Sequence, residues 1–210
     1  MRQIAVLGAT GSIGRSTLDV ITRHPDRYQA TLLAANCSVD DMEILCRQHM
    51  PPYAIMGQPD AAESLRERLS DSARITVLSG SEPLDDLVAD PAIHSVVAGI
   101  VGFAGLRSAL SAARAGKHIL LANKEALVSA GGLFMETVRS GGATLLPVDS
   151  EHNAMHQCLP IMNDGRPDMT HVEKIVLTAS GGPFRGRSRE VLDDVTPAEA
   201  CAHPNWARGR

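Results

Sequence analysis

The stretch Gln3-Ile-Ala-Val-Leu-Gly-Ala-Thr-Gly-Ser-Ile-Gly14 decides the fold, because it reads as a buried strand that runs directly into regularly spaced glycines. Gly8, Gly11 and Gly14 permit a tight turn and close backbone approach to an anion, which the N–H groups of the following helix would face. Their spacing is G-x-x-G-x-x-G rather than the commoner G-x-G-x-x-G. Because the motif lies between a strand and a helix, it favours a dinucleotide-binding turn over a purely structural one.

Short apolar runs alternate with helical patterns downstream of this turn, which is typical of a parallel sheet covered by helices. The alternation predicts an α/β domain over residues 1–150, with a Rossmann-like doubly wound parallel sheet. Strands are expected at Gln3–Leu7, Ala30–Ala35, Ala54–Met56, Ile75–Leu78, Ser95–Ala98, His118–Ala122 and Thr144–Val148, and helices at Ser12–Arg23, Val39–Gln48, Ala61–Leu69 and Leu106–Ala115.

Residues 151–210 are richer in loops and are predicted to begin a second, α+β domain that carries the substrate-binding part. Val172–Thr178 reads as a strand of that domain. The remainder holds too few apolar positions to build a core unaided, so the chain looks unfinished at Arg210.

The composition is that of a globular chain with a mild negative charge. Hydrophobic residues make up 44% of the sequence, the net charge is -4 and the pI is about 6.0. This balance excludes the disordered and membrane-spanning classes, and it gives nucleic acid or an anionic membrane no electrostatic attraction. A small anionic substrate is the expected partner. The first apolar run reads as a strand rather than a secretion signal, so we expect a cytoplasmic protein.

The cysteines and histidines do not form a zinc motif. His152 and His156 are four residues apart, but they lack the glutamate of H-E-x-x-H, so a structural or supporting role is expected. Reduced and mostly buried thiols are expected for the widely separated Cys37, Cys46, Cys158 and Cys201.

The residues after the second predicted strand bear on the choice between NAD and NADP. An NAD-binding domain usually has an acidic residue at the end of this strand, where it binds the ribose 2′-OH. Here the strand ends in Asn36-Cys37-Ser38, and acidic residues follow only at Asp40 and Asp41. The missing acid favours NADP, although no Lys or Arg stands there to bind the 2′-phosphate.

Asn123, Lys124 and Glu125 directly follow the predicted strand His118–Ala122. Ligands of parallel α/β sheets bind at the carboxyl ends of the strands, so these side chains are candidates for the site. Taken alone, they could equally be a solvated helix start, with Asn123 as N-cap.

Asp149, Ser150 and Glu151 follow the last predicted strand. Two carboxylates separated by one residue can converge on a hard cation such as Mg²⁺ or Mn²⁺. The alternative is a helix start, with Asp149 as N-cap and Glu151 in the first turn.

Five motifs, taken in order, resemble the 1-deoxy-D-xylulose 5-phosphate reductoisomerase family of the methylerythritol phosphate isoprenoid pathway. They are GATGSIG at 8–14, LLANKEALV at 120–128, LLPVDSEHNA at 145–154, LTASGGPFR at 177–185 and HPNW at 203–206. The resemblance implies rearrangement of a sugar phosphate and its reduction by NADPH to 2-C-methyl-D-erythritol 4-phosphate. It also implies one divalent cation, Mn²⁺ or Mg²⁺ with Co²⁺ as a further option, and a homodimer.

The resemblance also implies roles for individual residues. Asp149 and Glu151 are the metal ligands, and together with Lys124 and His203 they form the catalytic set. Substrate contacts are implied for Lys124, Ser150, Ser180, His203 and Trp206, the last two in a flap that closes over the substrate. Cofactor contacts are implied for Gly8, Thr10, Gly11, Ser12, Ile13, Gly14, Asn36, Asn123, Glu125 and Gly209.

The chain departs from the family pattern at three places. The family usually has a glycine and then a basic or amide pair where this chain has Asn36-Cys37-Ser38, and Ser-Met-Gly where it has Ala207-Arg208-Gly209. The resemblance also places a third carboxylate ligand and the rest of the substrate domain beyond Arg210. We therefore expect the chain as given to be inactive or nearly so.

Two other functions remain open at this point. The chain could be a nucleotide-binding fragment without turnover. It could also be another NAD(P)-dependent enzyme, of the semialdehyde dehydrogenase type, for which Cys158 near His156 is the candidate nucleophile.

Overall fold

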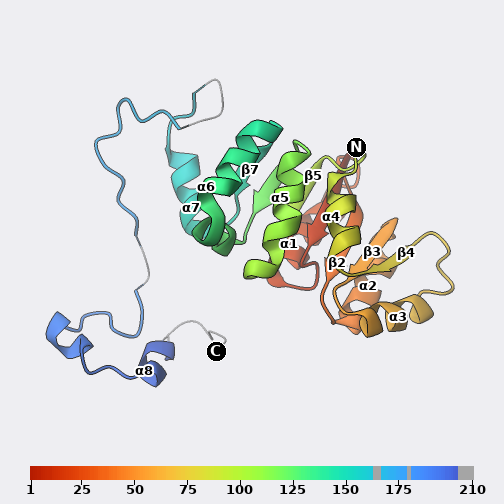
Figure 1. Ribbon diagram of the computed structural model, residues 1–210, viewed down its shortest axis with the longest axis horizontal. Helices are drawn as coiled ribbons and strands as arrows, with labels where there is room; N and C mark the ends of the chain where they lie inside the picture. The colour runs from red at the N-terminus through yellow and green to blue at the C-terminus, as the bar shows by residue number, and fades with distance from the viewer. Residues whose placement is uncertain (163–166, 179–180, 203–210) are drawn as a thin grey trace. The chain divides into compact units, whose positions relative to one another are not determined.

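The computed structural model describes residues 1–162, 167–178 and 181–202 (Figure 1). The chain forms two compact units, Met1–Cys158 and Leu159–Arg210. The division into functional domains at residue 150 stays a prediction. Within the described residues, no helix combines the length and apolar character needed to cross a bilayer.

The first unit is built on one parallel sheet, as predicted. In the described residues its strands follow the order β4-β3-β2-β1-β5-β6-β7, and every neighbouring pair is parallel. Chain order reverses between β1 and β5, which is the switch point of a doubly wound sheet. The strands are β1 (Arg2–Leu7), β2 (Tyr28–Ala35), β3 (Tyr53–Met56), β4 (Thr76–Ser79), β5 (Ser95–Ala98), β6 (His118–Leu121) and β7 (Thr144–Pro147).

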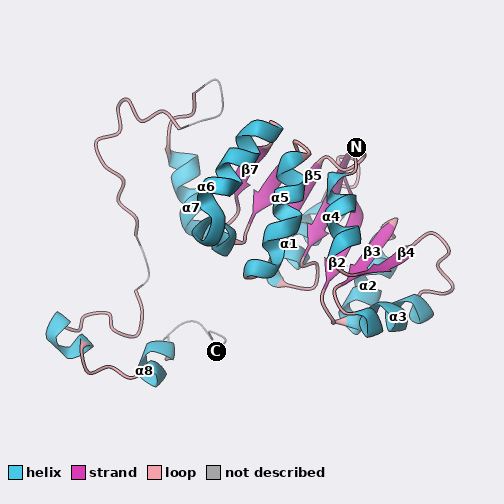
Figure 2. Ribbon diagram, viewed as in Figure 1, coloured by secondary structure: helices cyan, strands magenta, loops and turns pink. Residues whose placement is uncertain are grey.

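Helices cover both faces of this sheet (Figure 2). Residues of α1, α2 and α3 pack on one face and residues of α4, α5 and α6 on the other. The predicted helices α1, α2, α3 and α5 are confirmed, whereas α4 and the long α6 were not predicted. The bounds are α1 (Ser12–Arg23), α2 (Val39–His49), α3 (Pro59–Arg68), α4 (Ser81–Ala89), α5 (Leu106–Arg114), α6 (Lys124–Gly141) and α7 (Ser150–Cys158), with a 3-10 turn η1 (Phe103–Gly105).

The central strand β1 shows how the sequence fills both cores. Ala5 and Leu7 belong to the core under α4, α5 and α6, whereas Ile4 and Val6 belong to the core under α1, α2 and α3. Successive side chains of a strand point to opposite faces, so a strand covered on both sides must be apolar throughout. This is why Ile4–Leu7 is an uninterrupted apolar run.

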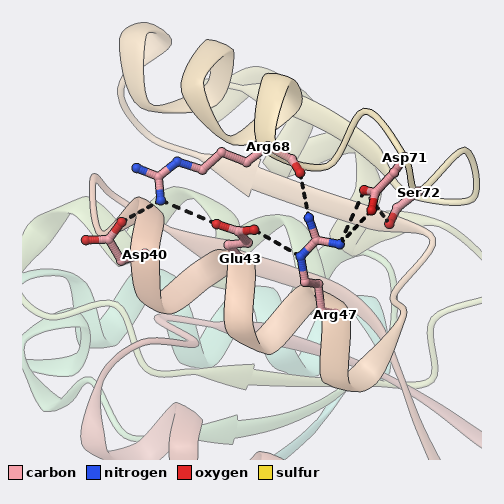
Figure 3. A network of polar contacts seen from close by, with 6 residues as sticks. All are labelled: Asp40, Glu43, Arg47, Arg68, Asp71 and Ser72. Carbon is pink, nitrogen blue, oxygen red and sulfur yellow. Dashed lines mark hydrogen bonds and ion pairs between the residues drawn. The ribbon is translucent and has the colours of Figure 1, made fainter.

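A network of ion pairs joins α2 to α3 and to the loop that follows α3 (Figure 3). Arg47 pairs with Glu43 at 2.9 Å and with Asp71 at 3.0 Å. Arg68 pairs with Asp40 at 2.5 Å and with Glu43 at 3.3 Å. Exposed pairs of this kind contribute little individually, but the shared Glu43 makes them a connected network.

In its described part, the second unit contains the 3-10 turn η2 (Arg189–Leu192) and helix α8 (Pro197–Cys201), and none of its described residues is buried. The prediction of a strand at Val172–Thr178 is wrong, because these residues have no strand assignment. A strand needs a hydrogen-bonded neighbour, and the described residues of this unit offer only the isolated bridge between Ile161 and Pro167.

All four cysteines are free thiols, as predicted, but only Cys46 is buried. The expectation of mostly buried thiols is therefore wrong. Cys37 lies in the loop after β2, and Cys158 and Cys201 end helices that bury no residues, so these three thiols are exposed.

Candidate functional site

The candidate site lies at the carboxyl edge of the sheet, beside the switch point between β1 and β5. Loops 8–11, 99–102, 122–123 and 148–149 follow β1, β5, β6 and β7, which are consecutive neighbours in the sheet. With strands about 4.8 Å apart, these loops span roughly 14 Å along the edge. The sequence motifs at residues 8–14, 123–125 and 149–151 are therefore brought to one edge.

The glycine turn lies tightly against its neighbours. The backbone N–H of Gly8 donates to the carbonyl of Ala34 at 2.9 Å, and Gly8 has a φ of +77°. A Cβ on Gly8 would stand 2.6 Å from the carbonyl oxygen of Gly99, and one on Gly14 would stand 2.4 Å from that of Gly8. Glycine is therefore required where the turn meets β5 and where α1 meets the turn.

The first turn of α1 is open to an anion. Gly11 is the N-cap, and no side chain caps the helix. Thr10 is half-buried, and Gly11 and Ser12 are exposed, so the turn predicted to hold a pyrophosphate is accessible from solvent. Unsatisfied N–H groups at a helix start attract negative charge.

The loop after β2 carries no positive charge. Asn36, Cys37 and Ser38 are exposed, and the Asn36 side chain lies against Gly57, where a Cβ would stand 2.5 Å from Asn36 Oδ1. Cations from other elements reach the helix that follows this loop, because Arg15 of α1 forms an ion pair of 2.8 Å with Asp41 in the first turn of α2, and Arg68 of α3 forms one with Asp40. Arg15 was not among the residues predicted for the site. The sequence feature that could have identified it is a positive charge near the start of a predicted helix, where the helix dipole disfavours it.

Asn123 is buried, with 4% of its surface exposed. Its Nδ2 donates to the carbonyl of Gly102 at 2.7 Å, whereas its Oδ1 is buried without a hydrogen-bond partner. A Cβ on Gly105 would stand 2.8 Å from this Nδ2, so the amide fits closely over the 3-10 turn. Asn123 is the N-cap residue of α6, and Lys124 and Glu125 are exposed, as the helix-start alternative predicted, but the Asn123 side chain is buried and makes no capping hydrogen bond.

Lys124 and Asp149 connect the ends of β6 and β7. The ammonium Nζ of Lys124 lies 3.0 Å from Asp149 Oδ2, with 53% of the lysine side chain and 14% of the aspartate side chain exposed. The hydrogen bond and charge of Asp149 raise the pKa of Lys124. Burial opposes ionisation of Asp149, but hydrogen bonds with Lys124 and Glu151 and the charge of Lys124 together lower the pKa of its carboxyl.

The second oxygen of Asp149 is less fully satisfied than the first. Oδ1 is buried and lacks a hydrogen bond, although His152 Nδ1 lies 3.0 Å away without hydrogen-bonding geometry. Ser150 and Glu151 are exposed at the start of α7. In the part of the chain that the structure describes, no three His, Cys, Asp or Glu side chains gather as a metal site. Asp149 and Glu151 therefore supply oxygen donors, but not a complete ligand set.

Other candidates lie away from this edge or outside the described residues. Cys158 ends α7, about 12 Å along the helix from its start near Asp149, so the structure gives no support to a thiol nucleophile at the edge. Ser180, His203, Trp206 and Gly209 lie outside the described residues.

Two family models match the chain. The one described as 1-deoxy-D-xylulose 5-phosphate reductoisomerase matches residues 4–131, and the one for the C-terminal domain of that enzyme matches residues 145–210. Together they include every described residue of the candidate site, Asn36 among them.

Similar proteins carry the same description. The 1-deoxy-D-xylulose 5-phosphate reductoisomerase of Ralstonia nicotianae is 57% identical, over 100% of this chain and 53% of its own length. That of Pseudomonas putida is 54% identical, over 100% of this chain and 53% of its own length. The chain thus spans about half the length of the curated relatives it matches.

Solved structures agree with this match. A crystal structure of DOX-P reductoisomerase in complex with NADPH, fosmidomycin and magnesium is 44% identical, with a TM-score of 0.86 over 100% of this chain and 52% of that one. The Zymomonas mobilis enzyme in complex with NADPH is 45% identical, with a TM-score of 0.85 over 94% of this chain and 50% of that one.

Proposed function

Because the chain belongs to the 1-deoxy-D-xylulose 5-phosphate reductoisomerase family, we propose that the protein converts 1-deoxy-D-xylulose 5-phosphate to 2-C-methyl-D-erythritol 4-phosphate with NADPH. The reaction joins a carbon-skeleton rearrangement to a hydride transfer, in isoprenoid precursor biosynthesis. One observation carries the proposal. An uncapped glycine-rich helix start, the unpartnered Oδ1 of Asn123 and the carboxylate of Asp149 line one edge of the sheet.

The edge fits a dinucleotide. The space that a Cβ would fill at Gly8 and Gly14 is kept clear, so the turn can approach a pyrophosphate closely. The buried Oδ1 of Asn123 can accept a hydrogen bond from a carboxamide, which removes the cost of leaving it unpaired. We assign the pyrophosphate to residues 8 and 10–14 and the nicotinamide side to Asn123 and Glu125, and we extend the cofactor contacts to Asn36 and Gly209.

The edge also fits a hard divalent cation in the type of its donors. We assign Asp149 and Glu151 as its protein ligands, because carboxylate oxygens suit Mg²⁺ and Mn²⁺, with Co²⁺ as a further option. When bound, the cation supplies Lewis-acid polarisation of substrate oxygens. Ser150, between the two ligands, is assigned to the substrate.

Lys124 has a separate role. The raised pKa keeps its ammonium charged, and its half-exposed side chain can turn from Asp149 towards a substrate oxygen. A fixed positive charge there stabilises negative charge that develops on that oxygen. We also assign Ser180, His203 and Trp206 to substrate contacts, on the family motifs alone.

We further propose a homodimer in the cytoplasm. Apolar side chains on α6 support an interface, since Val128 is 85% exposed and Leu133 is 57% exposed. Four free thiols are compatible with a reducing compartment. Sedimentation of the purified protein tests the dimer, and a monomer at micromolar concentration would contradict it.

A hybrid enzyme tests the activity. In it, residues 1–210 replace the matched half of the Ralstonia nicotianae relative, which is 57% identical. We expect the hybrid to oxidise NADPH only when 1-deoxy-D-xylulose 5-phosphate and Mg²⁺ or Mn²⁺ are both present. Asp149→Asn and Glu151→Gln should reduce the rate to background.

Glu136→Gln is the matched control, because Glu136 is an exposed carboxylate whose ion pair in the described part of the chain is with Arg139 on the same helix. Its rate should equal that of the unmodified hybrid. A folded hybrid without substrate-dependent NADPH oxidation, beside an active relative, would overturn the proposal.

A further inference from the structure

The loop after β2 leaves one part of an NADPH site without an evident partner. A 2′-phosphate needs a positive charge near the end of the second strand, yet Asn36, Cys37 and Ser38 are all uncharged. Asn36 directs its amide against Gly57 in the loop after β3. If this chain binds NADPH, the charge that binds its 2′-phosphate must come from another element.

Arg15 reaches this region from α1. Its Nε donates to the carbonyl of Thr10 at 3.0 Å, and its terminal nitrogen lies 2.8 Å from Asp41 Oδ1. The guanidinium therefore extends from the glycine turn to the first turn of α2, three residues beyond Ser38. A guanidinium has five N–H donors in a planar fork, so the two described partners leave donors for a phosphate.

The acidic residues that could bind a ribose 2′-OH are already paired. Asp41 is paired with Arg15, and Asp40 is paired with Arg68 in the network of Figure 3, at 2.5 Å. These pairs neutralise the negative charge of the first turn of α2. To accept a hydrogen bond from the ribose 2′-OH of NAD, either carboxylate would have to break its ion pair with an arginine.

We infer that Arg15 is the residue that determines preference for NADPH over NADH in this chain, by binding the 2′-phosphate. The inference rests on the proposed function. In this arrangement Arg15 Nε keeps its hydrogen bond to the Thr10 carbonyl. The terminal nitrogens bind the phosphate, either together with Asp41 or in place of it. Binding of a phosphate also accounts for the presence of a cation near the start of α1. The helix dipole disfavours positive charge there unless a negative charge compensates it.

Equilibrium titration of the 210-residue chain with NADPH and with NADH, without substrate, tests this. Arg15→Ala should weaken NADPH binding by about tenfold and leave NADH binding unchanged, because the lost contact is a charge-assisted one on a half-exposed side chain. Arg15→Lys should retain part of the preference, since it keeps the charge but loses the fork.

Arg23→Ala is the matched control. Arg23 lies on the same helix, is exposed and pairs with Asp19, but it is about 12 Å along the axis from Arg15. It should change neither affinity.

The outcomes separate the two proposals. Unmodified chain that binds neither dinucleotide overturns the proposed function and this inference together. Unmodified chain that prefers NADPH, with the same preference in Arg15→Ala, overturns only the role of Arg15. Equal weakening of both dinucleotides would also overturn it, because that result marks a purely structural side chain.

Discussion

The ammonium of Lys124 lies 3.0 Å from Asp149 Oδ2, so the residue that begins α6 holds the carboxylate that precedes α7. The pair joins the ends of β6 and β7 at the same edge as the glycine turn. It also means that a cation binding to Asp149 competes with an ammonium for the same negative charge.

Lys124→Met should therefore raise the affinity of the chain for Mn²⁺, by roughly the several-fold change expected from removing a partly exposed ion pair. Electron paramagnetic resonance titration of free Mn²⁺ measures this affinity directly. Lys174→Met, at an exposed lysine of the second unit, should leave it unchanged. Weaker Mn²⁺ binding by Lys124→Met would contradict the assigned competition.

Gly14→Ala should destabilise the first unit by about 1–3 kcal/mol, because the new Cβ would stand 2.4 Å from the carbonyl of Gly8 and the backbone must move. Gly132→Ala is the control, for which we expect a change in stability of opposite sign. Among the described residues, nothing beyond its chain neighbours and the adjacent backbone of α6 lies within 4 Å of its Cβ position, so alanine should stabilise the helix by about 0.5–1 kcal/mol. Urea unfolding followed by circular dichroism measures both. Equal effects of the two substitutions would contradict the packing described for the turn.

His49 should make stability depend on pH. Burial lowers its pKa, and it lines an open cavity of about 390 Å³ whose described lining residues include no acid. The unfolded chain therefore binds the proton first, so stability is full above about pH 6.5 and is lost as pH falls through the folded-state pKa. His49→Gln should remove this loss, at most about 1.4 kcal/mol per pH unit. Urea unfolding from pH 5 to 8 tests it, and a difference between variants that is independent of pH would contradict it.

Lys117→Met should cost about 1–3 kcal/mol of stability. Lys117 is buried, and its Nζ donates to the carbonyls of Asp90 and Ile93 at 2.5 and 2.7 Å. Methionine fills similar space but leaves both carbonyl oxygens without this donor. Thermal unfolding measures the loss, and a change below about 0.5 kcal/mol, the level typical of surface substitutions, would show that the two bonds contribute little.

The sheet could be predicted from the sequence because each strand carries its own signal. Ile4–Leu7 and Ser95–Ala98 are short, largely apolar runs, and such runs are typical of strands that are buried on both faces. Helix α6 was missed because Gly131 and Gly132 interrupt its helical pattern, and Ala130 has non-helical backbone angles at a kink. The false strand at Val172–Thr178 shows the limit of propensity, since pairing depends on a neighbour that a local pattern does not reveal.

The site could be predicted only in part. Loops at the carboxyl ends of strands identified Asn123 and Asp149, because topology alone brings such loops together. The burial of Asn123 and its unpartnered oxygen depend on Gly102 and Gly105, which are about 20 residues away in sequence and were not singled out. Arg15 was missed because its importance arises from a contact with Asp41, made across two helices.

Titration of the 210-residue chain with NADPH, followed by cofactor fluorescence, tests whether this edge of the sheet binds a dinucleotide. We expect saturable binding at one site per chain, and weaker binding in Asn123→Leu, which removes the buried Oδ1. Absence of saturable binding by the folded, unmodified chain would contradict the assignment of this sheet edge as a dinucleotide site.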